Sequence, residues 1–243
     1  LSFEAIDFAK KNKIDVIVLD HHQSEIKLPS AHSVVNPNRI DDKSNLQYLC
    51  AAGVTFMFLV STNRKLRLDN WFVENELKEP NLINYLDLVS LGTVCDVVPL
   101  VGLNRAIVKQ GLKVLRSKKN LGLKTLFDIC KIENKPSIYH MGFMLGPRIN
   151  AGGRVGKCSH GANLLLNTDP KIAFKLASEL DQFNKERQML EKNLLEEIVN
   201  EKKNYSKDPV IVISGTKWHE GVIGIVASRL KDKFNKPVIL ISI

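Results

Sequence analysis

Apolar positions in the first twenty residues indicate a helix followed by a strand. Phe3, Ile6 and Phe8 follow helical spacing within residues 2–12, and residues 16–19 form the continuous apolar run Val-Ile-Val-Leu. A short run of this kind is typical of a buried strand in a parallel sheet. A helix that leads into such a strand is the second half of a βαβ unit, so we expect the first strand of that unit to lie upstream of this sequence.

The next eighty residues predict a loop and two buried helices. Polar residues, together with Pro29 and the Asn-Pro-Asn segment at 36–38, favour a loop after the strand. Residues 49–61 are apolar or small, and residues 81–100 are largely apolar until Pro99 stops the pattern. Both segments have the length of helices rather than strands.

A long amphipathic helix is predicted in the second half of the chain. Its apolar side chains recur with a period of about 3.6 residues, at positions Ile172, Leu176, Leu180, Phe183, Leu190, Leu194 and Ile198. Asp169 is suited to be the N-cap and Pro170 the first helical residue, and the helix should run to about residue 203. Because this exceeds the usual length of globular helices, we expect a connector between domains.

The remaining residues predict a second α/β unit. An apolar strand at 210–213, a helix at about 222–234 and a strand from 238 onward form a βαβ unit. The fold class is therefore α/β, with three parts at residues 1–169, 170–204 and 205–243. The chain starts at Leu1 and stops inside an apolar run, so we expect it to be a piece of a longer protein.

Composition narrows the functional classes. The 243 residues are 44% hydrophobic and 25% charged, which excludes collagen-like, disordered and disulfide-framework proteins. No apolar run approaches the roughly 20 residues of a membrane span, and no secretory signal is visible at the start. The four cysteines are scattered without Cys-x-x-Cys spacing, which favours free thiols in a reducing compartment over a structural zinc site.

The chain carries excess positive charge. Its 35 Lys and Arg residues exceed 26 Asp and Glu residues, for a formal net charge of +9. This suits a polyanionic partner such as nucleic acid, although a basic surface that serves only solubility has the same composition. Cations recur on one helical face at Arg105, Lys109, Lys113 and Arg116, and continue to Lys131. This face either guides a nucleic-acid strand or is simply solvated.

Two acidic segments are candidates for metal or proton chemistry. Asp20-His21-His22 directly follows the first strand, at the sheet edge where open α/β folds bind ligands. The alternative is a strand-end cap with two surface histidines. Asp96 stands alone among apolar residues, and a buried aspartate needs a cation or several donors to stay ionised. Metal ligation satisfies that need, and so does capping of the next turn.

Two further segments are candidates for anion binding. Residues 146–156 contain four glycines and two arginines, a composition that lets backbone amides and guanidinium groups surround a phosphate; the alternative is a flexible loop with solvated arginines. Residues 218–224 lie between a strand and a helix, where amides favour an anion. Trp218 there suits either stacking on a base or ordinary packing.

These four segments together resemble the DHH phosphoesterase superfamily and, within it, the RecJ-type single-strand-specific exonucleases. The matching segments are Asp20-His21-His22, residues 91–100, residues 146–154 and residues 218–229, in the family's order. The resemblance implies a DHH domain with a parallel sheet (1–169), a connecting helix (170–204) and the start of a DHHA1 domain (205–243). It implies a bacterial, cytoplasmic, metal-dependent 5′→3′ exonuclease that hydrolyses phosphodiester bonds of single-stranded DNA in repair and recombination. Partners such as a helicase or a single-strand-binding protein, and no membrane, are implied in the same way.

The resemblance also implies roles for individual residues. The implied metal ligands are His21 and Asp96, and the implied catalytic residues are His22, which faces the scissile phosphate, and Asp20, which orients the pair. The implied substrate contacts are Arg148, Asn150, Arg154, His219 and the backbone amides of Gly221 and Val222.

The sequence departs from the family at its metal site. The family's Asp-x-Asp strand end and a further aspartate, which precede the DHH motif, have no counterpart here. One histidine and one aspartate cannot complete the ligand shells of a paired Mn²⁺ or Mg²⁺ site. We therefore expect the chain by itself to be inactive or nearly so. Two alternatives stay open, a DHH hydrolase of short oligonucleotides or cyclic dinucleotides and a non-catalytic nucleic-acid-binding module.

Overall fold

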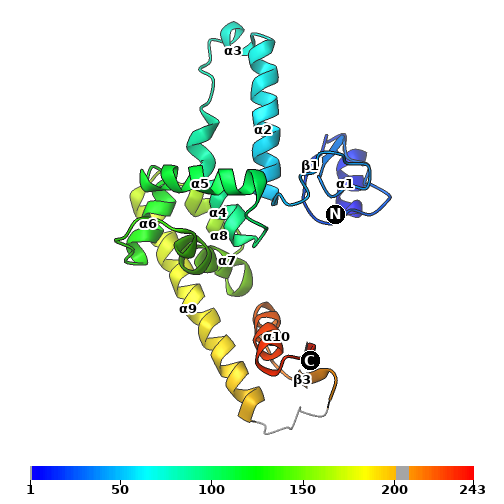
Figure 1. Ribbon diagram of the computed structural model, residues 1–243, viewed down its shortest axis with the longest axis vertical. Helices are drawn as coiled ribbons and strands as arrows, with labels where there is room; N and C mark the ends of the chain where they lie inside the picture. The colour runs from blue at the N-terminus through cyan, green and yellow to red at the C-terminus, as the bar shows by residue number, and fades with distance from the viewer. Residues whose placement is uncertain (1, 201–207) are drawn as a thin grey trace. The chain divides into compact units, whose positions relative to one another are not determined.

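The computed structural model describes residues 2–200 and 208–243 (Figure 1). The chain falls into two compact units. Unit 1 comprises Leu1–Lys119 and Lys135–Gly142, and unit 2 comprises Asn120–Asn134 and Phe143–Ile243. The division into three domains at residues 169 and 204 stays a prediction. The predicted end of the long helix, near residue 203, lies outside the described residues.

Unit 1 begins with one helix and a small parallel sheet. Helix α1 (Phe3–Lys11) and strand β1 (Ile17–Leu19) confirm the predicted helix and strand. The predicted loop is wrong in part, because Ser33–Val35 forms strand β2, paired parallel with β1 in the register Ile17↔Ser33. The sheet is also less buried than expected, since Ile17 is 52% exposed. Two short strands alone leave part of each strand open to solvent.

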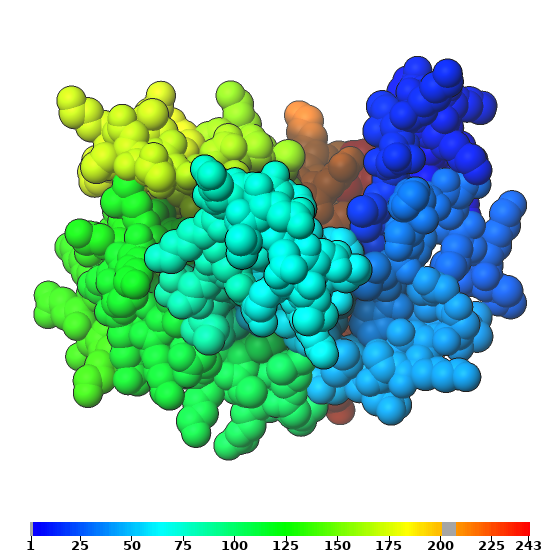
Figure 2. Space-filling model, turned by 90° about the horizontal axis from the view of Figure 1, so that it is seen from above, coloured from blue at the N-terminus to red at the C-terminus, as the bar shows by residue number. Residues whose placement is uncertain are grey.

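The rest of unit 1 is helical. Its helices in chain order are α2 (Ala51–Leu68), α3 (Trp71–Glu74), the 3₁₀ turn η1 (Leu82–Tyr85), α4 (Leu86–Cys95) and α5 (Gly102–Arg116). Helix α2 runs seven residues beyond its predicted end at Ser61. The last turns of α2 and the short helix α3 lie on the surface (cyan in Figure 2). Helix α4 ends before Pro99, because the backbone of Val97 turns into the left-handed region with φ of 58°.

Helices α4 and α5 pack closely in unit 1. Leu86, Val89 and Ile107 form a buried apolar cluster between them. A Cβ atom on Gly111 of α5 would lie 2.1 Å from Ser90 Oγ and 2.2 Å from the backbone oxygen of Leu86. Ser90 Oγ cannot move away freely, because it donates to that same oxygen at 2.6 Å. The close approach of the two helices therefore depends on a residue without a side chain.

Unit 2 is built around one long helix. Its elements before that helix are α6 (Leu121–Ile129), α7 (Gly146–Val155) and α8 (Ser159–Leu166), and a π-helical turn, η2 (His140–Leu145), leads into α7. Helix α9 (Pro170–Asn200) confirms the predicted long helix. Asp169 caps it as predicted, its Oδ1 accepting from the amides of Lys171 at 2.7 Å and Ile172 at 3.3 Å. Because α9 contacts α6, α7, α8 and α10, it is the scaffold of unit 2.

The predicted βαβ unit is confirmed at the end of the chain. Strands β3 (Ile211–Gly215) and β4 (Val238–Ser242) pair in parallel, and α10 (Glu220–Phe234) connects them. An apolar core joins this unit to the end of α9; its buried members are Leu194, Ile198, Ile211, Ile213, Trp218, Val222, Val226 and Leu230. Among the described residues, no helix has the length and apolar character needed to cross a membrane.

Replacing Gly111 by Ala should destabilise unit 1. The added methyl group meets backbone and a hydrogen-bonded hydroxyl, so we expect the free energy of unfolding to fall by about 1–3 kcal/mol. Gly224→Ala is the matched control, because a Cβ at that helical glycine meets nothing within 4 Å. The control should be neutral or stabilising by up to about 1 kcal/mol. Chemical denaturation measures both, and equal effects of the two substitutions would contradict this account of the α4–α5 contact.

Candidate functional site

The Asp20-His21-His22 turn is held by the carboxylate of Asp20. Asp20 Oδ1 accepts from the backbone amides of His21 at 2.7 Å and His22 at 3.2 Å, and lies 2.7 Å from His22 Nδ1. Burial acts to raise the pKa of Asp20, but the hydrogen bonds from His22 and from the two amides outweigh it, and the pKa lies below its ordinary value of 3.8. An ionised carboxylate only accepts hydrogen bonds, so Nδ1 of His22 carries the hydrogen and Nε2 is left for other contacts.

Two asparagines brace this turn from the end of the neighbouring strand. Asn36 Nδ2 donates to the backbone oxygen of His22 at 2.9 Å, and Asn38 Nδ2 donates to that of His21 at 2.6 Å. Asn36 is buried, and its Oδ1 accepts from the amide of Asn38 at 2.8 Å. The sequence analysis treated both as loop residues. A sign of their role was available, because they directly follow the β-branched pair Val34-Val35 and so lie at the carboxyl end of a second parallel strand.

The structure brings the two predicted metal ligands together. His21 Nδ1 lies 3.5 Å from Asp96 Oδ2, although 75 residues separate them in the sequence. The side chain of His21 is 18% exposed and that of Asp96 is 39% exposed. The expectation that Asp96 is buried is therefore wrong: Asp96 is the C-cap residue of α4, and its neighbour Val97 is exposed as well. His22 is close by and 78% exposed.

Residues beside Asp96 set its local environment. Burial, assisted by the negative charge of Asp96, raises the pKa of the Cys95 thiol to about 11, so this thiol stays protonated at neutral pH and is a poor metal ligand. Val97 has a side chain largely in solvent and a left-handed backbone, which is costly for a β-branched residue. All four cysteines are free thiols, as predicted.

The donor set does not complete a metal site. Within residues 2–200 and 208–243, no group of three or more His, Cys, Asp or Glu side chains is arranged to hold a metal ion. His21 and Asp96 supply one nitrogen and one carboxylate, whereas Mn²⁺ and Mg²⁺ take about six ligands, mostly oxygen. The described residues therefore fit only part of a divalent-metal site.

The glycine-rich segment at 146–156 is helical, which corrects the predicted anion-binding loop. Helix α7 covers Gly146–Val155, with Pro147 in its first turn. Its glycines permit helix packing: a Cβ on Gly152 would lie 2.9 Å from the backbone oxygen of Lys157 and 3.2 Å from the side chain of Leu180 in α9. Amides inside a helix donate to the helix itself, so they are not free to surround a phosphate.

The predicted phosphate contacts differ in how free they are. Arg148 is 18% exposed; its Nε donates to Asp181 Oδ1 at 2.8 Å and its Nη1 to the backbone oxygen of Met144 at 2.7 Å. Asn150 and Arg154 are exposed. Arg154 makes a single hydrogen bond that the structure describes, from Nη1 to the backbone oxygen of Gly221 at 3.1 Å. Asn150 and Arg154 are thus open to a ligand, and Arg148 serves the packing of α7 on α9.

The start of α10 is occupied by its own contacts. His219 is its N-cap, and its Nδ1 accepts from the amide of Gly221 at 3.1 Å, while the amide of Val222 donates to the backbone oxygen of His219 at 2.9 Å. Trp218 is buried and donates to Glu197 Oε1 at 3.1 Å, so its role is packing and not base stacking. The exposed ring of His219 is the group of this segment that a ligand reaches directly.

The predicted cationic face of α5 is exposed. Its members are Arg105, Lys109, Lys113 and Arg116. Val108 and Leu115 of the same helix point into the core. These cations and the Asp20 turn belong to unit 1, whereas Arg154 and His219 belong to unit 2.

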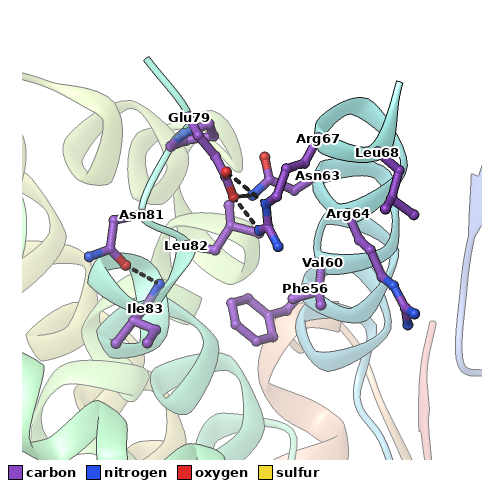
Figure 3. Close-up of a pocket in the computed structure, with 11 residues that line it drawn as sticks. Phe56, Val60, Asn63, Arg64, Arg67, Leu68, Glu79, Asn81, Leu82 and Ile83 are labelled. Atoms are coloured by element: carbon purple, nitrogen blue, oxygen red, sulfur yellow. Dashed lines mark hydrogen bonds and ion pairs between the residues drawn. The ribbon is translucent and has the colours of Figure 1, made fainter. Parts of the chain in front are cut away.

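A large cavity of unit 1 lies away from all the predicted site residues. It has a volume of about 650 Å³ between α2 and the segment around residues 79–83. Figure 3 shows Phe56, Val60 and Leu82 at its wall and the contacts of Glu79 with Arg67 and Asn63 near its mouth. Its mainly apolar lining offers little for binding a metal or a phosphate.

Replacing Arg148 by Gln should destabilise unit 2 in a pH-dependent way. Burial acts to raise the pKa of Asp181, but hydrogen bonds from Lys185 and Arg148 outweigh it and lower the pKa below 3.8. A lowered pKa means that the ion pair stabilises the fold above that pH and loses its effect as the pH falls through the folded-state pKa. We expect Arg148→Gln to cost roughly 1–3 kcal/mol at pH 7, and this difference from wild type to shrink below pH 4.

Lys185→Gln is the control for this prediction. Lys185 also pairs with Asp181, at 2.8 Å, but its side chain is 64% exposed. Its loss should cost at most about 1 kcal/mol. Urea denaturation between pH 3 and 7 measures both variants, and a cost of Arg148→Gln that stays constant over this range would argue against the ion pair.

Comparison with known proteins identifies relatives of this chain. Residues 1–93 match the family model described as the DHH family, N-terminal domain. The chain is 39% identical over 245 residues to the single-stranded-DNA-specific exonuclease RecJ of Dickeya dadantii, covering 98% of this chain and 42% of that protein. It is 34% identical over 237 residues to RecJ of Bacillus subtilis, covering 97% of this chain and 28% of that protein. The chain thus spans less than half the length of these curated relatives.

Solved structures give the same result. The crystal structure of an exonuclease RecJ bound to manganese matches with a TM-score of 0.82 and 32% identity, covering 99% of this chain and 58% of that one. RecJ of Thermus thermophilus in complex with Mn²⁺ matches with a TM-score of 0.83 and 32% identity, covering 99% of this chain and 34% of that one. The resemblance carried by the four segments is confirmed: residues 1–93 match the amino-terminal domain of the DHH family, and over nearly its whole length the chain is similar to the exonucleases RecJ.

Proposed function

We propose that this chain is part of a metal-dependent exonuclease that hydrolyses single-stranded DNA in the 5′→3′ direction, in DNA repair and recombination. The observation that carries the proposal is the 3.5 Å approach of His21 to Asp96 beside the exposed ring of His22. A histidine and a carboxylate from distant segments converge there at the end of a strand. The relatives named as single-stranded-DNA-specific exonucleases, and the RecJ structures that hold Mn²⁺ or Mg²⁺, support the same activity.

Each residue of the Asp20 turn has a distinct task in this proposal. His21 and Asp96 supply two ligands of a site for Mn²⁺ or Mg²⁺. Asp20 fixes the ring of His22, so that its Nε2 faces the scissile phosphate and stabilises charge on the non-bridging oxygens. Asn36 and Asn38 hold the backbone of the turn and so preserve the spacing of the two histidines.

The proposal extends to the substrate and its setting. Single-stranded DNA is the proposed polymer, held by the cations of α5 in unit 1 and by Asn150, Arg154 and His219 in unit 2. A helicase or single-strand-binding protein as a partner, and the bacterial cytoplasm as the compartment, are further proposals that rest on the resemblance alone.

A chimera tests the proposed activity. This chain would replace the matching segment of RecJ from Dickeya dadantii, whose remaining sequence supplies what this chain lacks. The chimera should hydrolyse 5′-phosphorylated single-stranded DNA with Mn²⁺, and His21→Ala or Asp96→Ala should slow it by about 100-fold or more, because each removes a metal ligand. The chain alone should show no hydrolysis above background, because its donor set is incomplete.

The matched control for the chimera is His32→Ala, which removes an exposed histidine of the same unit. It should leave the rate unchanged. A folded chimera without nuclease activity would contradict the proposed function. Hydrolysis by the chain alone that His21→Ala abolishes would contradict the incomplete metal site.

The cationic face of α5 has its own test. Lys109→Glu with Lys113→Glu in this chain should weaken binding of an oligothymidylate strand and reduce the slope of log K against log salt by about 2, one for each lost phosphate contact. Lys10→Glu with Lys11→Glu makes the same charge change on exposed lysines of α1. Fluorescence anisotropy over a salt series measures the slopes. Equal effects of both pairs would show that only net charge matters and would refute a specific role for α5.

A further inference from the structure

Two arginines of unit 2 contact one buried carboxylate, and a third arginine lies nearby. Glu191 of α9 is buried, with only 3% of its side chain exposed. Arg187, one turn earlier on α9, donates from Nη1 to Glu191 Oε2 at 3.1 Å. Arg229 of α10 contacts Glu191 Oε1 through its Nε. Two guanidinium groups thus share one carboxylate between α9 and α10.

A third cation, Arg154, lies near these two arginines. It extends from the end of α7 to the start of α10, where it donates to the backbone oxygen of Gly221. Burial lowers the pKa of Arg187 most strongly; Glu191 opposes this effect, and the positive charges of Arg154 and Arg229 lower the pKa further. Arg154 and Arg229 therefore each lie close enough to Arg187 for their charges to act on it. Three positive charges against one negative leave the group with a net charge of +2.

The arginines differ in how firmly they are held. Arg187 is fixed, because its side chain is 12% exposed and its Nη2 also donates to Asn184 Oδ1 at 3.0 Å. Arg229 is 60% exposed, and its contact with Glu191 Oε1 is a charge contact without an aligned hydrogen bond. Arg154 is exposed as well. Arg154 and Arg229 thus retain N–H groups for a ligand, and Arg187 is a fixed charge behind them.

Such a cluster costs free energy unless an anion offsets it. Guanidinium groups match the oxygens of phosphate through paired N–H donors and are poorly replaced by lysine there. Arg187 and Arg229 already offset the charge of Glu191, so the bridge between α9 and α10 does not need Arg154, whose described hydrogen bond is to a backbone oxygen. We propose that Arg154, Arg187 and Arg229 form a binding site for a backbone phosphate of single-stranded nucleic acid, in which Glu191 positions Arg187 and Arg229. The choice of a nucleic-acid phosphate rests on the proposed function.

Binding of a labelled oligothymidylate strand to this chain, in EDTA, tests the proposal without any hydrolysis. Arg229→Gln should lower the affinity by about 3- to 10-fold and reduce the salt slope by about 1. Lys231→Gln is the matched control, because it removes an exposed cation two residues away on the same helix. Equal losses for Arg229→Gln and Lys231→Gln would overturn the proposal.

Inorganic phosphate provides a second probe that separates this site from the proposed function. At equal ionic strength, phosphate should raise the Tm of the wild-type chain above its value in chloride, and Arg229→Gln should remove that increment. If the wild-type chain shows this increment but binds no oligothymidylate, the arginine site is supported and the proposed function fails. If the wild-type chain and Arg229→Gln bind oligothymidylate equally and neither responds to phosphate, the arginine site is refuted and the proposed function stands.

Discussion

The candidate site depends on the pairing of two three-residue strands. Because β1 and β2 run parallel, the Asp20 turn and the Asn36–Asn38 segment emerge at the same edge of the sheet. The side-chain amides of Asn36 and Asn38 donate to the backbone oxygens of His22 and His21. Asp20 accepts hydrogen bonds from the backbone amides of the two histidines. A slip of one residue in the register would reverse the faces of the strand residues and separate these partners. Six residues of sheet therefore fix the positions of two histidines.

The helices of unit 1 place Asp96 at the sheet edge where His21 lies. Helix α4 ends at Cys95, one residue before Asp96, and Val97 then turns the chain through a left-handed conformation. Asp96 reaches His21 from this helix end. Helix α5 holds α4 in place across the contact at Gly111, where any side chain would collide with backbone. The geometry of the pair thus rests on packing about two turns away from it along α4. Strain at Val97 is offset by that packing, as is common where a fold positions a functional group.

The sequence predicted the elements with strong periodicity and missed those decided by tertiary contact. Helix α9, its Asp169 cap and the final βαβ unit follow from local pattern and were right. Strand β2 was missed, because three residues are too few to show a period. Helix α7 was missed because glycine has low helix propensity, which packing against α9 overrides at Gly152. Of the site, His21 and Asp96 were paired through resemblance, but no local signal shows that Asp96 is exposed. The position of Asn36 directly after Val34-Val35 was a sign of its role, but that apolar pair is too short to predict a strand.

Helix α9 explains why Arg148 and Arg154, which both belong to α7, make different contacts. It carries two buried acidic residues, Asp181 and Glu191, ten residues or nearly three turns apart. Asp181 forms an ion pair with Arg148 from the first turn of α7. The guanidinium group of Arg148 therefore links α7 to α9. Arg154, at the other end of α7, meets no carboxylate that the structure describes and donates instead to the backbone oxygen of Gly221. The nearby Glu191 already has Arg187 and Arg229 as partners. The positions of acidic residues on α9, and not the glycine-rich segment itself, thus determine which arginine remains available to an anion.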